Sequence, residues 1–529
     1  MMDPTRGLFK VPTKEERIAQ RAGASLNPFT LLGSLNAIQW LLFASGYIAW
    51  TMDAYDFFSV SLNVTRLTTA FSKTSTDITT SITLTLLFRS LGAVTFGLLS
   101  DRYGRKWPLV GNLFLIAVFS LATGFCRSFG AFLGVRCLFG IAMGGIWGMS
   151  AATALENAPA QARGLLSGIL QQGYAFGYLI AAGVNLSSFM EGPADRWPRL
   201  FYLGAGLSLF AAIFRACLPE SELFLRGKAE RAAAAQEGVS NDRAFGIALK
   251  DMLKTHWKIS IYGILFMTGF NFLSHSSQDL YPTMIQKVSL ARLPTAEASH
   301  LSSMATIIGN CGAIAGGLIA GYLSQYLGRR LTMVAFIVLV GVLIPAWILP
   351  TSFSGLAAGA FFIQFGVQGA WGVVPIYLNE IAPPAFRAVW AGLSYQLGNM
   401  VSSASAQIEA RGGESLQIHN PKCPYNAAGV AVCPTGQEPT IANYAKVSAI
   451  LLGVVCGYLL LVIIFLGTEA RGTHFETAPP ATELGAGKVT AGDLREDAED
   501  HGHIGQEKDI EHIGDRETRS QGSSSKEKL

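Results

Sequence analysis

One polar segment, residues 271–283, carries side chains that could bind both an anion and a proton. It reads NFLSHSSQDLYPT and lies inside a longer apolar stretch. At about 100° per residue, its polar positions fall on one helical face roughly 140° wide. A single polar side chain in an apolar helix usually bonds a neighbouring helix, whereas several on one face favour a lined cavity. The residues on this face are Asn271, Ser274, His275, Gln278 and Asp279.

Two members of that face, His275 and Asp279, are one helical turn apart and can share a proton. Imidazole titrates near neutrality, and a carboxylate one turn away stabilises its charged form. Burial could equally make the carboxyl group the proton carrier. The two groups titrate as a coupled pair, so the sequence does not say which one holds the proton.

Arg89, in another apolar stretch, can supply the positive charge that a carboxylate needs in a low-dielectric cavity. Its guanidinium is a planar fork that matches the two oxygens of a carboxylate. We therefore predict an anion site around Arg89. Further hydrogen bonds to the same anion can come from three amides and one imidazole: Asn271, Gln278, Asn399 and His275.

Asp53 and Asp56, three residues apart in the first apolar stretch, are a second candidate for proton coupling. Ionisable residues inside a membrane are costly, and they face either a cavity or a partner. The structural alternative is a salt bridge from these acids to Arg89 or Arg136. The sequence leaves both interpretations open.

Other kinds of chemistry have no matching residues. The seven cysteines form neither a CxxC motif nor a Cys/His cluster. We find no phosphate-binding glycine loop, no nucleophile–base motif and no basic run with interleaved aromatic residues. We therefore expect no metal, no cofactor, no enzymatic activity and no nucleic-acid partner.

The elements that position the polar residues are long apolar helices. Of 529 residues, 50% are hydrophobic and 14% are charged, whereas soluble domains are about 25% charged. A helix of about 20 apolar residues crosses a bilayer, so we expect an all-α integral membrane protein with twelve transmembrane helices. They are expected at 34–59, 79–100, 108–126, 130–152, 164–185, 199–218, 258–282, 301–324, 331–350, 354–377, 386–407 and 446–467.

These helices divide the chain into five regions. A polar stretch separates two sets of six helices, and the final residues are rich in charge, serine and glycine, which is typical of disorder. The regions are a cytosolic N-terminal segment (1–33), a six-helix bundle (34–218), a cytosolic middle loop (219–257), a second six-helix bundle (258–467) and a disordered cytosolic tail (468–529).

The two halves repeat each other at a constant offset. Trp147 and Trp371 are 224 residues apart, as are Glu156 and Glu380 (371 − 147 = 380 − 156 = 224). The pairs Arg163/Arg387 and Gln172/Gln396 have the same spacing. Parallel six-helix repeats predict two pseudo-symmetric bundles that rock about a central site.

The loops and helix ends carry motifs that resemble those of the major facilitator superfamily. Gly97-x-x-x-Asp101-Arg102-x-Gly104-Arg105-Lys106 resembles its motif between helices two and three. Arg136-x-x-x-Gly140 resembles its fourth-helix motif, and Pro219-Glu220-Ser221 the motif after its sixth helix. The resemblance covers roughly residues 34–467 and implies the two-bundle major facilitator fold.

Seven charged residues in or near these motifs are expected to hold and gate the scaffold rather than to bind substrate. Asp101 can pair with Arg105, and Glu156 and Glu380 can form matching contacts with arginines seven residues later. In the second copy of the loop motif, Gln325 replaces the aspartate, so the gate is expected to be asymmetric. The seven are Asp101, Arg105, Arg136, Glu156, Arg163, Glu380 and Arg387.

Basic residues in short loops predict the orientation in the membrane. Arg102, Arg105 and Lys106 follow the second span, and Arg329 and Arg330 follow the eighth. The positive-inside rule places these loops, and with them both termini, in the cytosol. The loop before the last span then faces outside, where Cys423 and Cys433 can form a disulfide. The sequence does not decide whether they pair.

The segment 271–283 also resembles a motif of the fungal lactate–proton symporters, the Jen-type permeases of the sialate–proton symporter branch. That motif reads Asn-x-x-Ser/Thr-His-x-Ser/Thr-Gln-Asp-x-x-x-Thr, and this chain matches it without a gap. Phe88-Arg89-Ser90 and Tyr395-Gln396-Leu397-Gly398-Asn399 also resemble that family. The resemblance implies a proton-coupled symporter for lactate, pyruvate or a related acid in the plasma membrane.

Three alternatives share the same sequence features. The protein could carry dicarboxylates, if Arg136 faces the cavity and binds a second carboxylate. It could export a substrate in exchange for protons, or bind a nutrient without moving it. The expected partners are a small carboxylate, a proton and the lipid bilayer, and the charged tail allows regulatory proteins as further partners.

Overall fold

The computed structural model describes most of the chain between residues 27 and 493. Its described residues are 27–469, without 74, 160, 191–193, 222–223, 226–240, 280, 286–288, 291–292, 424–430 and 434–437, together with 478–479, 481, 483, 485–490 and 493. Residues 1–26 of the expected N-terminal segment lie outside them, as do 226–240 of the middle loop and most of the tail. Regulatory partners of the tail therefore stay a prediction.

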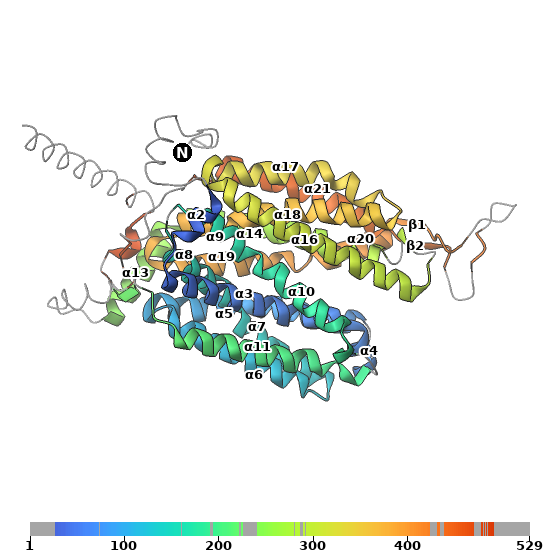
Figure 1. Ribbon diagram of the computed structural model, residues 1–529, viewed down its shortest axis with the longest axis horizontal. Helices are drawn as coiled ribbons and strands as arrows, with labels where there is room; N and C mark the ends of the chain where they lie inside the picture. Colours follow the sequence, from blue (N-terminus) through green and yellow to red (C-terminus); the bar gives the residue numbers. More distant parts are fainter. Residues whose placement is uncertain are drawn as a thin grey trace, which may run out of the picture.

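The described chain is almost entirely helical and forms two bundles that lie side by side (Figure 1). We call the first the N bundle; the short helix α2 (Pro28–Gly33) precedes it. Asn36 begins the first long helix with a reciprocal capping box to Gln39. The N bundle contains α3 (Ala37–Leu62), α4 (Val64–Phe71), α5 (Ser75–Tyr103), α6 (Lys106–Gly124), α7 (Phe129–Gly144), α8 (Ile146–Glu156), α9 (Arg163–Gln171), α10 (Gly173–Leu186), η1 (Ser188–Met190), η2 (Ala194–Arg196) and α11 (Pro198–Cys217).

The second bundle, which we call the C bundle, follows α13 (Asn241–Thr255) in the chain. Near its end, the strands β1 (Gln417–His419) and β2 (Thr440–Ala442) pair antiparallel. The C bundle contains α14 (Trp257–Gln278), α15 (Tyr281–Met284), α16 (Thr295–Leu327), α17 (Arg329–Ile348), α18 (Phe353–Ile381), η5 (Pro384–Phe386), α19 (Arg387–Ser402), α20 (Ser405–Ser415), α21 (Tyr444–Leu461) and the π-helical η6 (Val462–Leu466).

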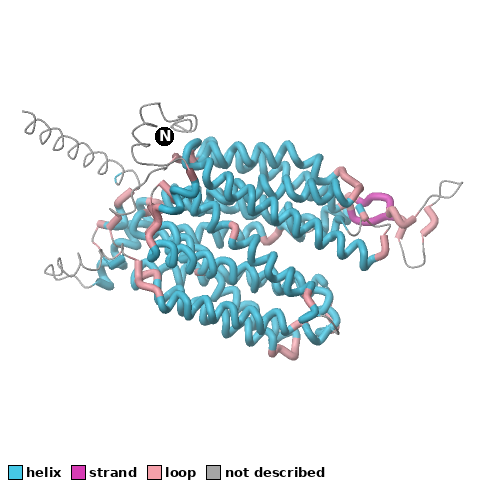
Figure 2. Tube along the Cα trace, viewed as in Figure 1, coloured by secondary structure: helices cyan, strands magenta, loops and turns pink. Residues whose placement is uncertain are grey.

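The molecule has two chemically different ends. The basic end, on the left of Figure 1, holds α13 and the short loops that join α5 to α6 and α16 to α17. The hairpin end holds β1 and β2, the only strands drawn in Figure 2. A disulfide between Cys423 and Cys433 closes the loop between these strands, so the pairing that the sequence left undecided is present.

Eight helices of the described chain are long and apolar enough to cross a membrane. They account for eight of the twelve expected spans. The other four correspond to α3 and α14, which carry the buried polar residues, and to α9–α10 and α19–α20, which are interrupted near their middles. These four spans are less apolar or less continuous than the other eight, because polar side chains or breaks interrupt their apolar runs.

Buried ion pairs at the basic end follow the internal repeat. Arg105 binds both Asp101 and Glu156, with its Nη2 2.9 Å from Glu156 Oε1. In the second half, Arg329 binds Glu380 at the same distance and through the same atoms. The expected Asp101–Arg105 pair is therefore present. The arginines that bind the two glutamates come from the loop motifs, a pairing that the sequence analysis did not give.

The arginines that the sequence analysis expected to contact those glutamates each begin a helix. Arg163 is the first residue of α9, and its Nε donates a 3.0 Å hydrogen bond to the carbonyl of Ala158. Arg387 occupies the equivalent place at the start of α19. Both side chains are buried, which supports a scaffold role for them.

Two equivalent hydrogen-bonded contacts join the bundles at the basic end. Asp101 of α5 accepts hydrogen bonds from the backbone N–H groups of Ala388 and Val389 in α19, at 3.4 and 3.0 Å. Gln325 of α16 accepts one from the N–H of Gly164 in α9, at 3.3 Å. The two contacts obey the repeat offset, since 325 − 101 and 388 − 164 both equal 224. Replacing the aspartate by glutamine therefore changes the charge of the gate and keeps its geometry.

Small residues let the bundles approach closely along a second seam. The hydroxyl of Ser167 donates to the carbonyl of Gly372 at 2.8 Å and accepts from the N–H of Ile376 at 3.0 Å. A Cβ at Gly168 would collide with the carbonyl oxygen of Gly317. These contacts lie between the middle of the molecule and its basic end, so the bundles are closed against each other there.

One segment of the tail, which the sequence analysis expected to be disordered, is among the described residues. Residues Ala486–Lys488 form the 3-10 helix η7. Ala486 packs with Ala248 of α13 and Phe386 of η5 in one apolar cluster. An apolar face on α13, which the sequence analysis did not use, gives these tail residues enough surface to fold against.

Candidate functional site

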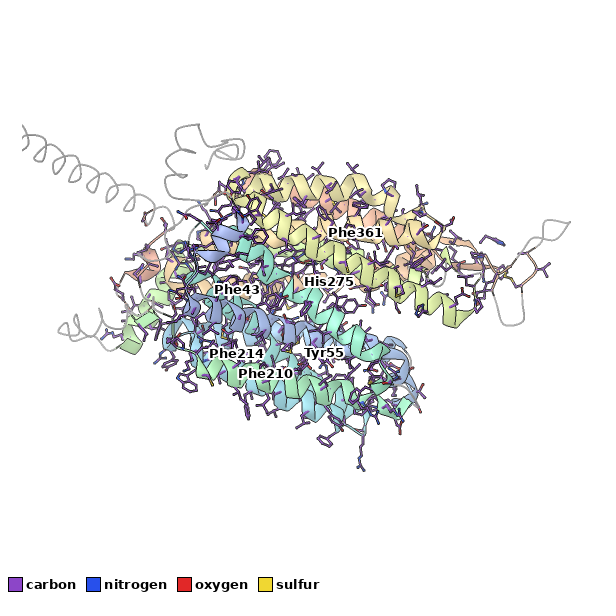
Figure 3. The ribbon with its side chains drawn as sticks, viewed as in Figure 1. Phe43, Tyr55, Phe210, Phe214, His275 and Phe361 are labelled. Carbon is purple, nitrogen blue, oxygen red and sulfur yellow. A yellow bond between two sulfur atoms is a disulfide. The ribbon has the colours of Figure 1, made fainter. Side chains whose placement is uncertain are left out.

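A small cavity lies between the bundles; Figure 3 labels His275 of its lining near the middle of the molecule. The space for the centres of water-sized molecules is about 20 Å³, enough for one or two waters. The lining residues come from α3, α5, α9, α10, α14, α18 and α19: Trp50, Phe57, Leu86, Arg89, Gln171, Tyr174, Asn271, Ser274, His275, Gln368, Trp371, Tyr395 and Asn399.

Arg89 is the cation of this cavity and is 3% exposed. Its Nη2 forms a 2.8 Å salt bridge with Oδ2 of Asp53 on α3. Its Nε has no hydrogen-bond partner among the described residues, and neither does Asp53 Oδ1. Because an unpaired buried donor on a charged group is costly, the guanidinium retains capacity for one more anionic oxygen.

His275 connects the cavity to two polar partners. Its Nδ1 lies 3.1 Å from Oδ2 of Asp279, and its Nε2 lies 3.1 Å from Oδ1 of Asn399 on α19. The His275 side chain is 12% exposed and that of Asp279 35%. With both contacts donated, the imidazole would be the doubly protonated cation. The pair can therefore hold a proton beside the cavity.

Two of the predicted binding residues make other contacts. The Asn271 amide lines the cavity but donates to the carbonyls of Met267 and Tyr395, at 2.9 and 3.3 Å. The Gln278 amide donates to Gln364 of α18 at 2.8 Å. Gln278 is not among the lining residues, because α14 ends there and the side chain packs within the C bundle.

Asp53 and Asp56 do not share one site. Asp53 binds Arg89, which is the salt bridge that the sequence left as an alternative, and it is connected to the cavity through that arginine without being one of the lining residues. Asp56 accepts hydrogen bonds from the hydroxyls of Ser120 and Ser208, at 2.7 and 3.0 Å. Its environment is therefore the interior of the N bundle, and it does not line the cavity.

Arg136 is buried away from the cavity. It is 1% exposed, and its guanidinium carbon lies 4.0 Å from the centre of the Phe139 ring. It does not appear in the cavity lining. This position fits the expected scaffold role and gives no second cation for a dicarboxylate.

Aromatic rings that the sequence analysis did not assign to the site close the cavity. Tyr395 stacks on Trp147 with centroids 4.8 Å apart, and its ring lies edge-on to Trp50 and Trp371 at 6.2 and 6.0 Å. Trp147 and Trp371 are the repeat-related pair noted above. Their equivalent positions on two bundles were a signal for this cluster.

Two further polar side chains of the lining were also missed. Gln171 accepts a 3.4 Å hydrogen bond from the indole of Trp147, and Gln368 Oε1 is buried without a partner among the described residues. An amide inside an apolar span is the signal that could have found them.

Comparison with known proteins identifies relatives over most of the chain. A family model described as "Sugar (and other) transporter" matches residues 26–260 and 258–417. A carboxylic acid transporter protein homolog of Saccharomyces cerevisiae is 34% identical over 456 residues, which cover 84% of this chain and 70% of the yeast protein. A probable 4-methylmuconolactone transporter of Cupriavidus pinatubonensis is 25% identical and covers 68% of this chain and 80% of its own.

Solved structures share the fold. The major facilitator superfamily proton:xylose symporter XylE aligns with a TM-score of 0.62 at 16% identity, covering 85% of this chain and 99% of its own. The human organic anion transporter MFSD10 aligns with a TM-score of 0.54 at 14% identity, over 82% and 100% of the two chains. The expected fold class is confirmed, and the relatives are transporters and not enzymes.

Proposed function

Because this chain belongs to the sugar (and other) transporter family of the major facilitator superfamily, we propose that it is a proton-coupled symporter that imports short carboxylates such as lactate or pyruvate. The observation that carries the proposal is the guanidinium of Arg89. It lines a cavity between the bundles, is held by one carboxylate and keeps a buried N–H without a partner. A substrate carboxylate supplies the missing acceptor.

Proton coupling follows from competition for that guanidinium. Asp53 occupies Nη2 of Arg89 at 2.8 Å, so an ionised Asp53 reduces the positive charge available to a substrate. A proton on Asp53, or on the nearby His275–Asp279 pair, raises the net charge of the site by one. Proton and anion then bind more favourably together than either does alone.

The lining favours a monocarboxylate of small size. Arg89 is the one arginine of the lining, and Arg136 lies outside it. The aromatic rings of Trp50, Trp371 and Tyr395 leave little volume, which fits a short chain better than a sugar. The yeast relative is named as a carboxylic acid transporter homolog, and this supports the same substrate class.

The direction of transport rests on the orientation of the two ends. We place the basic end, with both termini, in the cytosol on the positive-inside rule, and the disulfide-closed hairpin end outside a plasma membrane. The closed basic end then makes this an outward-facing arrangement. Binding of both ligands allows the bundles to rock and the contacts at Asp101 and Gln325 to part.

The test is uptake of labelled lactate by liposomes that contain the purified full-length chain and a trapped pH-sensitive dye. With an inward proton gradient, we expect accumulation that a protonophore abolishes, together with lactate-driven internal acidification. Succinate uptake without lactate uptake would overturn the monocarboxylate assignment. Internal alkalinisation during substrate movement would indicate an exporter, and binding without movement would indicate a sensor.

A further inference from the structure

Glu409, on α20 between the cavity and the hairpin end, is a buried acid that the proposed function does not use. It is 0% exposed, and both of its carboxyl oxygens are buried without an acceptable hydrogen bond among the described residues. The Ser448 hydroxyl on α21 interacts with the carboxyl group but does not meet hydrogen-bond geometry. Among the described residues, no cation therefore pairs with a negative charge at this position, and the interaction that favours such a charge comes from the Ser448 hydroxyl.

The burial of Glu409 makes its ionised form unfavourable. An isolated carboxylate transferred from water to an apolar interior costs far more than a neutral acid, and in practice such groups take up a proton. A structural acid is normally paired with an arginine or a lysine, as Asp101 and Glu380 are in this chain. Glu409 has no such pair among the described residues, so packing alone does not account for an acid here.

The charged groups around Glu409 lie on three elements. At the C-terminal end of α14, the capping residue Asp279 interacts electrostatically with Glu409, and Asp279 is bonded to His275. On α21, the titratable groups near the start are Tyr444 and Lys446, and Lys446 is exposed. On α20 itself, Arg411 and Glu414 are exposed. Strand β2, which also contacts α20, contributes no charged residue.

Asp279 is thus the acid that interacts electrostatically with Glu409. Its side chain is 35% exposed, whereas that of its partner His275 is 12% exposed. Asn399, which contacts His275 at 3.1 Å, is on α19, and α20 continues the same expected span after a break at residues 403–404. The same expected span therefore carries the buried acid Glu409 and the amide Asn399, which lines the cavity.

We propose that Glu409 is the outer proton-holding residue of the carrier, which receives a proton from external water and passes it to the His275–Asp279 pair. In the transfer, the O–H bond of Glu409 breaks and an O–H bond forms on a carboxylate oxygen of Asp279. Glu409 is left as a transient carboxylate, and its burial makes it take the next proton from the outer side. This step rests on the proposed proton coupling.

The first test compares Glu409→Gln with Glu414→Gln, an exposed position on the same helix, in liposomes that contain the full-length chain. The wild-type rate of lactate uptake should rise by up to about tenfold per unit fall in external pH where protonation limits it. Glu409→Gln should lose this rise and lactate-driven acidification, yet retain exchange of internal for external lactate at equal pH. Glu414→Gln should match the wild type.

Wild-type acid stimulation in Glu409→Gln would overturn the proposal and leave the proposed function intact. Failure of the proposed function has a different signature, because the wild type itself then shows no lactate-driven acidification. Asp279→Asn serves as the reference for lost coupling.

A second measurement does not depend on folding of the variant. A hydrophobic carbodiimide reacts with carboxyl groups in their protonated form. Applied to the wild-type protein at pH 7.5, it should modify Glu409 and not Glu414, as read by mass spectrometry of the peptides. Recovery of residue 409 without modification would overturn the proposal.

Discussion

At the scale of the residue, the cavity depends on one guanidinium with two competing partners. Arg89 is bound to Asp53 through Nη2 and keeps Nε unpaired. A substrate carboxylate can accept a hydrogen bond from Nε of Arg89 while Asp53 is bound. It can bind both Nε and Nη2 only after the salt bridge between Arg89 and Asp53 breaks. The strength of anion binding is therefore linked to the protonation of a neighbouring acid.

Arg89→Gln should weaken substrate binding because an uncharged amide replaces the charged fork. Loss of a hydrogen bond to a charged group costs about 1.5–3 kcal/mol, so we expect the KM for lactate to rise about ten- to a hundredfold. The measurement is the concentration dependence of initial uptake. Arg411→Gln, at an exposed position on α20, is the matched control. An unchanged KM in Arg89→Gln would remove this residue from the site.

Asp53→Asn should have the opposite effect on binding. Without the competing charge, Arg89 is free at every pH, so the KM at pH 7.5 should fall toward the wild-type value at pH 5.5. Proton-driven accumulation should be lost at the same time. If the KM rises instead, as in Arg89→Gln, then Asp53 only positions the guanidinium.

The sequence indicated part of the cavity lining. Arg89, His275 and Asn399 were predicted from residue type, and the structure places all three in one cavity. Gln278 was predicted from helical periodicity, which gives the face of a helix but not where its cavity contact ends. The partners of Asp56 come from two other helices, and spacing along one helix carries no information about them.

At the scale of the element, the least apolar spans supply much of the site. The four less apolar or interrupted spans contribute nine of the thirteen lining residues; they are α3, α9–α10, α14 and α19–α20. The twelve spans could be predicted from the sequence because each contains an apolar run of about 20 residues. The breaks at residues 172 and 403–404 could not be predicted, because no proline marks either one and the glycines around residue 172 also occur within continuous membrane helices.

Gly168→Ala should prevent the close approach of α9 to α16. A Cβ there would collide with the carbonyl of Gly317, whereas a Cβ at Gly183 would meet no atom within 4 Å. Alanine is otherwise favoured over glycine in a helix by about 1 kcal/mol, so only the first substitution is harmful. We expect lactate uptake to fall in Gly168→Ala and to stay near the wild-type rate in Gly183→Ala. Equal rates in the two variants would contradict a closure at this seam.

The docked tail segment should respond to acid through His256, which precedes α14. Burial lowers the pKa of His256 below its ordinary 6.5, although the carbonyls of Val489 and Gly487 oppose the shift. The neutral form therefore favours docking of η7. The stability that neutral His256 gives to the docked segment is fully present above pH 6.5. It is lost as the pH falls through the lowered pKa of His256 in the docked state. Hydrogen exchange at residues 486–489 should accelerate at low pH in the wild type but not in His256→Gln; no acceleration in the wild type would contradict this.

At the scale of the whole molecule, two bundles related by a 224-residue offset close against each other at one end. The offset was readable from the sequence, because both tryptophans and both glutamates keep it. The partners across the interface were not, because the N–H groups of Val389 and Gly164 have no sequence signature.

Asp101→Ala should open the basic end more than Gln325→Ala does. Asp101 accepts two backbone hydrogen bonds and pairs with Arg105, whereas Gln325 accepts the N–H of Gly164 without a charge. Charge-assisted hydrogen bonds are roughly twice as strong as neutral ones. Labelling of the variant Gly392→Cys, at the contact between α19 and α8, measures the opening, because a Cβ there would meet its nearest atom at an ordinary 3.5 Å. Greater labelling in Gln325→Ala than in Asp101→Ala would contradict this ranking.

The unequal contacts at Asp101 and Gln325 also give the opening an order in time. The weaker contact, at Gln325, breaks more readily than the stronger, charge-assisted contact at Asp101. The seam between α9 and α16 should part before the seam between α5 and α19, and the path to the interior should widen from one edge. A released anion would then leave along the α9–α16 edge, and residues on that edge would influence its departure rate more than its equilibrium binding.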